Sequence, residues 1–241
     1  MDVSVVLPTW NRSGESRHSE FLDECLVSLC QQDFDGKWEL LIGTEMPQKF
    51  GAMSLDVIES WREPFKQRGI PLKVLVQHAD PDSGHGPTDN DLYAMARGKY
   101  VTRPLGDDEL YRENFISRLF VEMEGEEDAV LAYADFEDID DKGNVLRQRV
   151  RGGYTDERIR RECFIGICVL IDLAWWKEMG YQWSNIKAGE DWQMWKEMAE
   201  DTCPSRFLYV NEFLGQWRDW SGTLTSSVRK GDIEAMKDYT A

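Results

Sequence analysis

The residues best suited to chemistry lie in Leu105-Gly106-Asp107-Asp108-Glu109-Leu110, which places adjacent carboxylates directly after an expected strand at 98–102. Adjacent carboxylates repel each other, and lining them up at a strand end does not favour folding. A hard cation such as Mg²⁺ or Mn²⁺ removes the repulsion, because it takes oxygen ligands from one or two carboxylates and from substrate phosphates. Residues 105–110, called the acidic segment below, therefore form a candidate metal–diphosphate site. The alternative is a solvated turn in which Asp107 or Asp108 caps a following helix.

A second acidic pair, Glu190-Asp191, opens an expected helix at 190–200. Carboxylates at a helix start interact favourably with the helix dipole and cap free N–H groups, which is the structural interpretation. A helix start is also a rigid place to hold a carboxylate as a general base. The sequence pattern alone is consistent with both interpretations.

Composition excludes several classes of partner. The chain has 241 residues, 41% of them hydrophobic and 30% charged, as expected for an ordinary globular protein with a substantial core. Its net charge of −17 argues against nucleic acid and against anionic lipid, since both require clusters of Lys and Arg. Met1-Asp2-Val3 leads directly into a strand, and no apolar run approaches the ~20 residues that span a bilayer. We therefore expect a soluble, cytoplasmic protein.

The metal-binding and nucleophile motifs of several familiar classes are missing from the sequence. Its five cysteines form no CxxC pair and predict free thiols in a reducing compartment, and its three histidines lack the spacing of zinc ligands. There is no Walker A motif, no GxGxxG after a strand and no GxSxG, which disfavours P-loop NTPases, dinucleotide dehydrogenases and serine hydrolases.

Apolar strands alternate with amphipathic helices over the first ~110 residues, which predicts a right-handed βαβ array. Strands are expected at 3–7 (stopped by Pro8), 38–42, 72–77 and 98–102, and helices at 19–30, 55–65 and 89–97 (closed by Gly98). The second half predicts helices at 114–124, 173–179 and 190–200, strands at 129–136 and 207–210, an apolar stretch at 164–172, and a hairpin turn at 138–144. The expected fold class is α/β, with one mainly parallel, mixed sheet flanked by helices and a Rossmann-like N-terminal half. Ligands of such sheets bind beyond the carboxyl ends of the strands, where Pro8–Arg12, Gly43–Glu45 and the acidic segment fall.

Several motifs, in this order, resemble family 2 glycosyltransferases, which have the GT-A fold. Val3–Arg12 resembles the family's apolar strand followed by Pro-Thr-Tyr-Asn-Arg, and 89–101 resembles its Arg-Asn helix that ends in Ala-x-Gly-x-Tyr-Ile. The acidic segment stands where the family has its Asp-x-Asp metal motif. Tyr133-Ala134-Asp135, Glu190-Asp191-Trp192 and Trp217-Arg218 follow at matching places, so that the resemblance extends to about Thr225.

The resemblance implies a single GT-A domain over 1–241, with a nucleotide-sugar and metal half (1–110), an acceptor half (111–225) and a polar tail (226–241). It implies a hexosyltransferase-like enzyme that uses Mn²⁺ or Mg²⁺ to transfer a sugar from a nucleotide-diphosphate donor to a hydroxyl-bearing, carbohydrate acceptor. The donor-binding residues implied are Pro8, Thr9, Arg12, Glu45, Asn90 and Asp107, with Asp107 and Asp108 at the metal and Asp191 as catalytic base. Glu190 is placed on the acceptor or sugar side.

The proposed chemistry is coherent on its own terms. A metal neutralises the departing diphosphate as a Lewis acid, and a carboxylate takes the proton of the acceptor hydroxyl. One base without an enzyme nucleophile predicts a single displacement with inversion at the anomeric carbon. Of the ten tryptophans, Trp192 and Trp195 are expected in the core, whereas Trp183 and Trp220 are candidate sugar-stacking platforms.

Three departures from the family pattern keep alternatives open. Asp89 replaces the Arg that precedes Asn90 in the family, so a positive contact is missing or comes from elsewhere. The second strand ends in Gly43-Thr44-Glu45 rather than Asp-Asp-Gly-Ser, and Trp220 stands where many members have His. The alternative function is a non-catalytic nucleotide- or sugar-binding protein on a degenerate GT-A scaffold. A nucleotidyltransferase is a third possibility, but the Gly-rich basic triphosphate loop that it normally needs is not visible.

Overall fold

The structure is a computed structural model that describes residues 1–9, 16–46, 51–78, 86–106, 109–186 and 189–220. Within these residues the strands are β1 (Val3–Thr9), β2 (Trp38–Met46), β3 (Leu72–His78), β4 (Tyr100–Thr102), β5 (Glu109–Tyr111), β6 (Leu131–Ile139), β7 (Val145–Arg149), β8 (Val169–Asp172) and β9 (Phe207–Arg218). The α-helices are α1 (Ser16–Cys30), α2 (Gly51–Ser60), α3 (Arg62–Gln67), α4 (Gly86–Met95), α5 (Phe115–Gly125), α6 (Asp156–Arg161), α7 (Leu173–Met179) and α8 (Glu190–Glu200).

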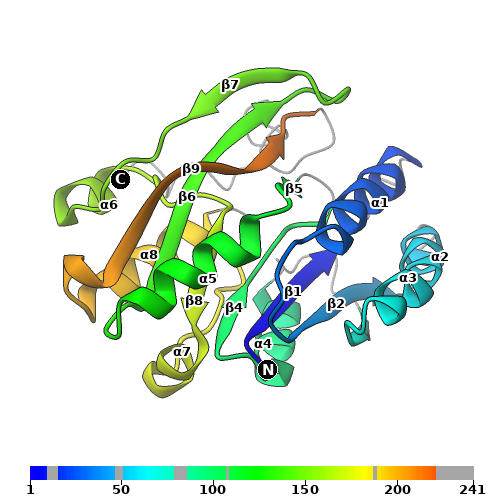
Figure 1. Cartoon of the computed structure of the whole chain (residues 1–241), viewed down its shortest axis with the longest axis horizontal. Coiled ribbons are helices and arrows are strands. Elements are labelled where there is room, and N and C mark those ends of the chain that lie inside the picture. The colour runs from blue at the N-terminus through cyan, green and yellow to red at the C-terminus, as the bar shows by residue number, and fades with distance from the viewer. Residues whose placement is uncertain (10–15, 47–50, 79–85, 107–108, 187–188, 221–241) are drawn as a thin grey trace.

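The strands form one mixed sheet in the order β3-β2-β1-β4-β8-β6-β9-β5, with β7 paired to β6 (Figure 1). Strands β3, β2, β1 and β4 pair in parallel, as expected for successive βαβ units. In the second half β6 and β9 are parallel, while β8, β5 and β7 join their neighbours antiparallel. The predicted fold class, an α/β protein with one mixed sheet and a Rossmann-like N-terminal half, is confirmed.

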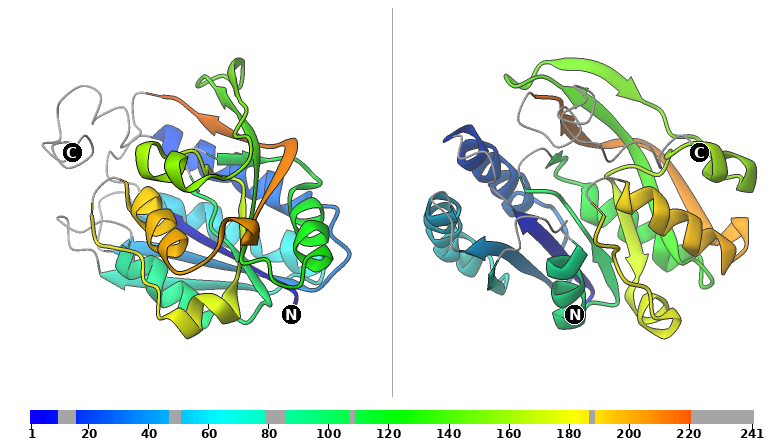
Figure 2. Two further views of the ribbon diagram at one scale, coloured as in Figure 1. Left: turned by 90° about the vertical axis from the view of Figure 1, so that its left-hand side faces the viewer. Right: turned by 180° about the vertical axis from the view of Figure 1, so that it is seen from behind.

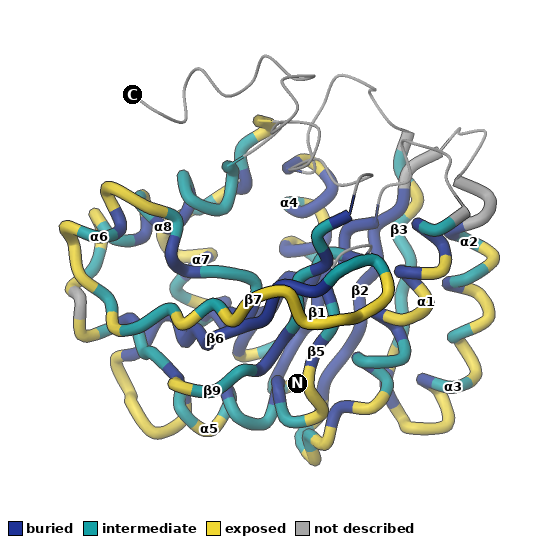
Figure 3. The backbone as a smooth tube through the Cα atoms, turned by 90° about the horizontal axis from the view of Figure 1, so that it is seen from above, coloured by how far each residue is buried: buried dark blue, intermediate teal, exposed yellow. Residues whose placement is uncertain are grey.

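Helices cover both faces of the sheet (Figure 2). Helices α1, α2, α3 and α5 contribute to one apolar core, and α4, α6, α7 and α8 to a second. Alternation along β1 shows why both exist, because Val3, Val5 and Leu7 join the first core and Val6 joins the second. Figure 3 shows β1, β2 and β6 as buried strands inside helices with exposed outer residues. The sheet therefore has to be apolar on both sides, which the continuous run Val3–Leu7 provides.

Several predicted element boundaries differ from those of the structure. Strand β1 continues through Pro8 to Thr9, because β4 pairs with β1 only as far as Val5 and leaves that edge of Pro8 without a ladder partner. The single helix predicted at 55–65 is two helices, α2 and α3, that meet at Trp61.

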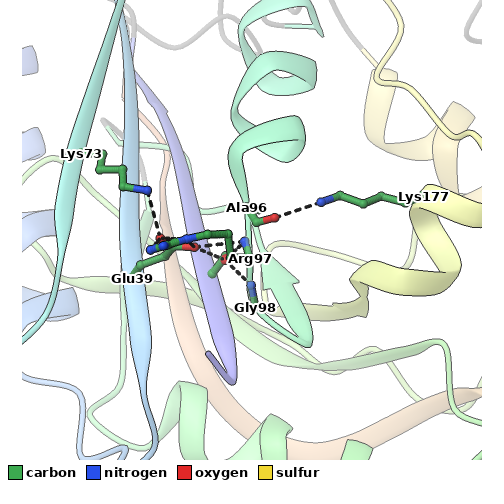
Figure 4. A network of polar contacts seen from close by, with 7 residues as sticks. Glu39, Lys73, Ala96, Arg97, Gly98 and Lys177 are labelled. Atoms are coloured by element: carbon green, nitrogen blue, oxygen red, sulfur yellow. Dashed lines mark hydrogen bonds and ion pairs between the residues drawn. The ribbon is translucent and has the colours of Figure 1, made fainter.

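The predicted glycine cap of α4 was also wrong. Helix α4 ends at Met95, and Lys177 Nζ of α7 donates to the Ala96 carbonyl at 2.9 Å (Figure 4). Gly98 does not have a positive φ. A glycine is required there because a Cβ atom would lie 2.5 Å from the Ser4 nitrogen and 2.5 Å from the Tyr100 oxygen.

Beyond the end of α4, a buried carboxylate joins three parts of the chain (Figure 4). Glu39 of β2 is fully buried and accepts hydrogen bonds from Ser4 Oγ at 3.0 Å and Arg97 Nη2 at 2.6 Å. Lys73 Nζ of β3 lies 3.6 Å away. Burial opposes ionisation of Glu39, but the hydrogen bonds from Arg97 and Ser4 outweigh it and lower the pKa of this carboxyl.

We expect Glu39→Gln to lower the free energy of unfolding at pH 7 by about 1–3 kcal/mol, the range for hydrogen bonds to a charged group. Because the folded-state pKa of Glu39 is lowered, its contribution is complete above the unfolded value of about 4.3 and is lost as the pH falls through the folded value. Urea unfolding at pH 7, 5 and 3.5 measures both effects. The control is Glu59→Gln, whose exposed ion pair with Arg62 should contribute much less to stability. Equal losses in the two variants would contradict the prediction.

Candidate functional site

The acidic segment starts beside the carboxyl end of β1, where the sheet topology predicts a ligand. Gly106 N donates to the Pro8 carbonyl at 3.4 Å. A Cβ atom on Gly106 would lie 3.0 Å from Leu22 Cδ1 and 3.3 Å from Thr9 Cβ, so the backbone approaches β1 and α1 closely. Asp107 and Asp108, predicted at the metal, lie outside the described residues.

Glu109 has a structural role in the acidic segment. It is 3% exposed, and its Oε2 accepts a hydrogen bond from Leu105 N at 2.9 Å and another from the Tyr111 hydroxyl. These bonds join the two ends of the acidic segment. Glu109 begins strand β5, and α5 begins only at Phe115, so the alternative that Asp107 or Asp108 caps an immediately following helix is wrong. Glu109 is therefore held by internal bonds, and the metal role of Asp107 and Asp108 stays a prediction.

The predicted donor-binding residues of β1 and β2 meet at one edge of the sheet. Pro8 pairs in register with Gly43, and Thr9 with Thr44, while Glu45 follows in β2. Thr9 is buried, and its Oγ1 has no hydrogen-bond partner among the described residues. A buried hydroxyl without a partner at this edge is suited to contact a polar ligand. The Arg12 residue and the Glu45 side chain lie outside the described part of the chain.

Helix α4 is fastened to the segment that precedes α8. Asn90 Nδ2 donates to the Trp183 carbonyl at 3.0 Å, and its Oδ1 accepts from Trp183 N at 2.8 Å. A Cβ atom on Gly86 would lie 2.4 Å from the Ser184 carbonyl oxygen, so the start of α4 also packs directly on this backbone. The structure thus gives Asn90 a positioning contact, and its predicted contact with the donor stays a prediction.

Arg103, at the end of β4, supplies a cation that the sequence reading missed. Its Nη2 lies 2.6 Å from Asp89 Oδ2 of α4 and 3.5 Å from Glu190 Oε1 of α8, and its side chain is 6% exposed. Burial would lower its pKa, but Asp89 and Glu190 raise it above the usual value, so Arg103 stays charged. The only sequence signal was an isolated basic residue just before the acidic segment.

The start of α8 presents the predicted base. Gly189 has φ +82°, a conformation that favours glycine, and it turns the chain into Glu190 and Asp191. Asp191 is partly exposed, and its Oδ1 accepts from Trp192 N at 2.7 Å while its Oδ2 lies 3.5 Å from Cys163 Sγ. Burial and the charge of Asp191 hold the pKa of the Cys163 thiol well above its ordinary value, so the thiol stays protonated and donates to Asp191.

The two acidic pairs are linked through Arg103. Arg103 contacts Glu190 and precedes Asp107 by four residues, a chain length that spans at most about 14 Å. Burial raises the pKa of the Glu190 carboxyl; Arg103 opposes this shift, and the charge of Asp191 adds to it. Arg103 thus connects the start of α8 to the strand that leads into the acidic segment.

The tryptophans predicted as sugar platforms are buried. Trp183 is 3% exposed, packs against Trp176 and Trp195, and has the Arg103 guanidinium 4.3 Å from its ring centroid. Trp220 is 5% exposed and packs edge-on against Phe21. The stacking prediction for both is not supported, because a platform needs an exposed ring face. The core prediction is confirmed for Trp195, and the partly buried Trp192 packs against the same core.

The carboxylate oxygens of the acidic segment are ligands of the kind that a hard divalent ion takes. The described residues contain no group of three or more His, Cys, Asp or Glu side chains that could hold a metal by themselves. Two carboxylates completed by substrate phosphates are the ligand set that Mg²⁺ commonly uses, and Asp107 and Asp108 supply such a pair. The five cysteines are free thiols, as predicted.

This sheet, flanked by helices on both faces, has the GT-A fold seen in solved glycosyltransferase structures. The chain is similar to S. aureus TarS 1–349 in complex with UDP-GlcNAc, with a TM-score of 0.75, 17% identity and coverage of 94% of this chain and 61% of that one. It is also similar to the mannosyltransferase PcManGT from Pyrobaculum calidifontis in complex with GDP-Man and Mn²⁺, with a TM-score of 0.63, 13% identity and coverage of 90% and 56%. The chain thus spans about three fifths of the length of these proteins. No family model matches the sequence.

Among the described residues, no helix is both long enough and apolar enough to cross a bilayer.

Proposed function

We propose that this chain is a metal-dependent, inverting glycosyltransferase that moves a sugar from a nucleotide-diphosphate donor to a hydroxyl acceptor. The observation that carries the proposal is the position, in a GT-A fold, of Glu190-Asp191 and of Leu105-Gly106, which lead into the first acidic pair. The acidic segment lies against the end of β1, and Glu190-Asp191 is joined to the strand before it through Arg103. Neighbours with this fold hold UDP-GlcNAc in one case and GDP-Man with Mn²⁺ in another, which supports a nucleotide-sugar donor here.

In this proposal the N-terminal half binds the donor. Thr9, with its unpartnered hydroxyl, lines the edge of the sheet where the nucleotide would lie, together with Pro8, Arg12 and Glu45. Asp107 and Asp108 would hold Mg²⁺ or Mn²⁺, which supplies positive charge to the diphosphate leaving group. Glu109 keeps the acidic segment closed through its bonds to Leu105 and Tyr111.

Asp191 acts as the general base for the acceptor hydroxyl. Its Oδ1 is oriented by Trp192 N and its Oδ2 by the Cys163 thiol, so the carboxylate is held in one direction at a helix start. Taking the hydroxyl proton as the acceptor attacks the anomeric carbon requires one base and gives inversion. Glu190 would lie on the acceptor or sugar side of this base.

In this proposal Arg103 takes the place of the positive charge that the family pattern has before Asn90. Asp89 replaces an arginine, but Arg103 lies 2.6 Å from it, so the cation comes from β4 instead of α4. This exchange supports a retained site over a degenerate scaffold.

The test is a donor panel of UDP, GDP and dTDP sugars with Mn²⁺, Mg²⁺ or EDTA, measured by thermal shift and by release of the nucleoside diphosphate. The expected result is stabilisation and turnover with at least one donor, both lost in EDTA. Sugar binding that needs neither nucleotide nor metal, without turnover, would instead establish the non-catalytic alternative.

A further inference from the structure

Arg103, which follows β4, contacts both α4 and α8, the helices that carry Asn90 and the Glu190-Asp191 pair. It pairs with Asp89 of α4, and it lies 3.5 Å from Glu190 at the start of α8. Its guanidinium lies 4.3 Å from the Trp183 ring centroid, a distance typical of stacking, so its plane is fixed as well as its charge.

The charged side chains around Arg103 are buried, which costs free energy of desolvation. Asp89 is fully buried, and its Oδ1 and the Arg103 Nε find no hydrogen-bond partner in the described part of the chain. A buried ion pair often stabilises a fold no better than well-packed apolar side chains would, and it can instead serve to fix a specific geometry. A cation shared by two helices fixes how those helices lie relative to each other.

We propose that Arg103 is a positioning residue that sets the start of α8, and with it Asp191, relative to the donor-side helix α4 through its ion pairs with Asp89 and Glu190. Only the role of Asp191 as base rests on the proposed function. Asn90 reinforces the arrangement, because its two hydrogen bonds hold the Trp183 backbone to the same helix. Among the described residues, the charged or titratable groups around the Glu190–Asp191 pair are Arg103 after β4, Asp89 of α4 and the thiol of Cys163. Arg151 lies beside that cysteine.

The test compares Arg103→Gln with the control Arg97→Gln. Arg97 pairs with the buried Glu39 beyond the C-terminal end of α4, so the control also removes a guanidinium from a buried carboxylate. We expect Arg103→Gln to lower kcat about 100-fold, as misplacement of a catalytic group by about 1 Å can do, with the donor KM changed less than about threefold. The acid limb of the kcat/KM profile should move to higher pH, because the carboxylate pair loses a cation. Hydrogen exchange in the first turn of α8 should become faster. Arg97→Gln should change stability alone.

The charge swap Asp89→Arg with Arg103→Asp is the rescue variant. It restores a cation between the same elements. Its kcat should be at least about tenfold higher than that of Arg103→Asp alone. If Arg103→Gln does not fold, Glu190→Gln leaves the Asp89–Arg103 pair intact and should still speed exchange in the first turn of α8.

A purely structural role predicts a different result. In that case Arg103→Gln lowers the unfolding temperature but leaves kcat, the pH profile and exchange at α8 unchanged, and the positioning proposal is overturned. If the wild-type chain turns over no donor, the proposed function fails, whereas the exchange measurement still decides whether Arg103 positions α8.

Discussion

Replacing Asp191 by Asn is expected to lower kcat for glycosyl transfer by about 10²–10⁴-fold, the range for loss of a general base. Asn has nearly the same shape and can still accept the hydrogen bond from Trp192 N, but it cannot take a proton from the acceptor hydroxyl. Donor affinity, measured by calorimetry with metal present, should change less than about threefold, because the donor contacts lie on the other acidic pair.

The matched control for this substitution is Asp172→Asn. Asp172 stands at the start of α7, where its Oδ1 accepts from Trp175 N at 2.7 Å, and Asn is an equally good residue at a helix N-cap. Turnover should therefore be retained in the control. A normal kcat in Asp191→Asn, with the chain folded, would remove Asp191 from the role of base.

The second large effect is expected for Asp108→Ala. Loss of a metal ligand should abolish the difference between donor binding with Mn²⁺ and binding with EDTA, and should lower kcat/KM by about 10²-fold or more. The reason is that the departing diphosphate then carries charge that no cation neutralises. Calorimetry of the nucleoside diphosphate with and without Mn²⁺ measures the binding directly.

The control for the metal prediction is Glu113→Ala, an exposed carboxylate that follows β5. It tests whether any loss of negative charge near the acidic segment weakens metal binding. If Asp108→Ala keeps metal-dependent donor binding, Asp108 is not the metal ligand that the family resemblance implies.

Most of the architecture could be predicted because it depends on local patterns. The continuous run Val3–Leu7 indicates a strand covered on both faces, and the alternation of such runs with helices indicates parallel pairing. The helices Leu173–Met179 and Glu190–Glu200 have the predicted bounds, since the first follows the capping residue Asp172, the second opens with Glu190 and Asp191, and both carry apolar residues at helical spacing. Gly98 shows where such prediction fails. It was predicted as a helix cap, but a glycine is needed there because the backbone of β1 lies too close for a Cβ atom, which is a long-range contact.

The candidate site was predicted less completely, for the same reason. The sequence shows Glu109 only as a third acidic residue beside Asp107 and Asp108, whereas the structure shows it buried and bonded to Leu105 and Tyr111. Trp183 looked like a sugar platform, but its ring packs in the core beneath Arg103. Neither outcome is visible in composition or spacing, because side-chain exposure depends on what the rest of the chain places nearby.

The amino-acid sequence by itself determined the α/β architecture and the placement of acidic residues at strand and helix ends, because hydrophobic periodicity and turn chemistry act over a few residues. Only the tertiary structure decided that Asp89 and Glu109 are buried in internal bonds. It also decided that Arg103, rather than an arginine before Asn90, provides the cation between the two halves. The pairing of Asp89, Arg103 and Glu190 joins three elements that are far apart in the chain, and such contacts depend on how the sheet and helices pack.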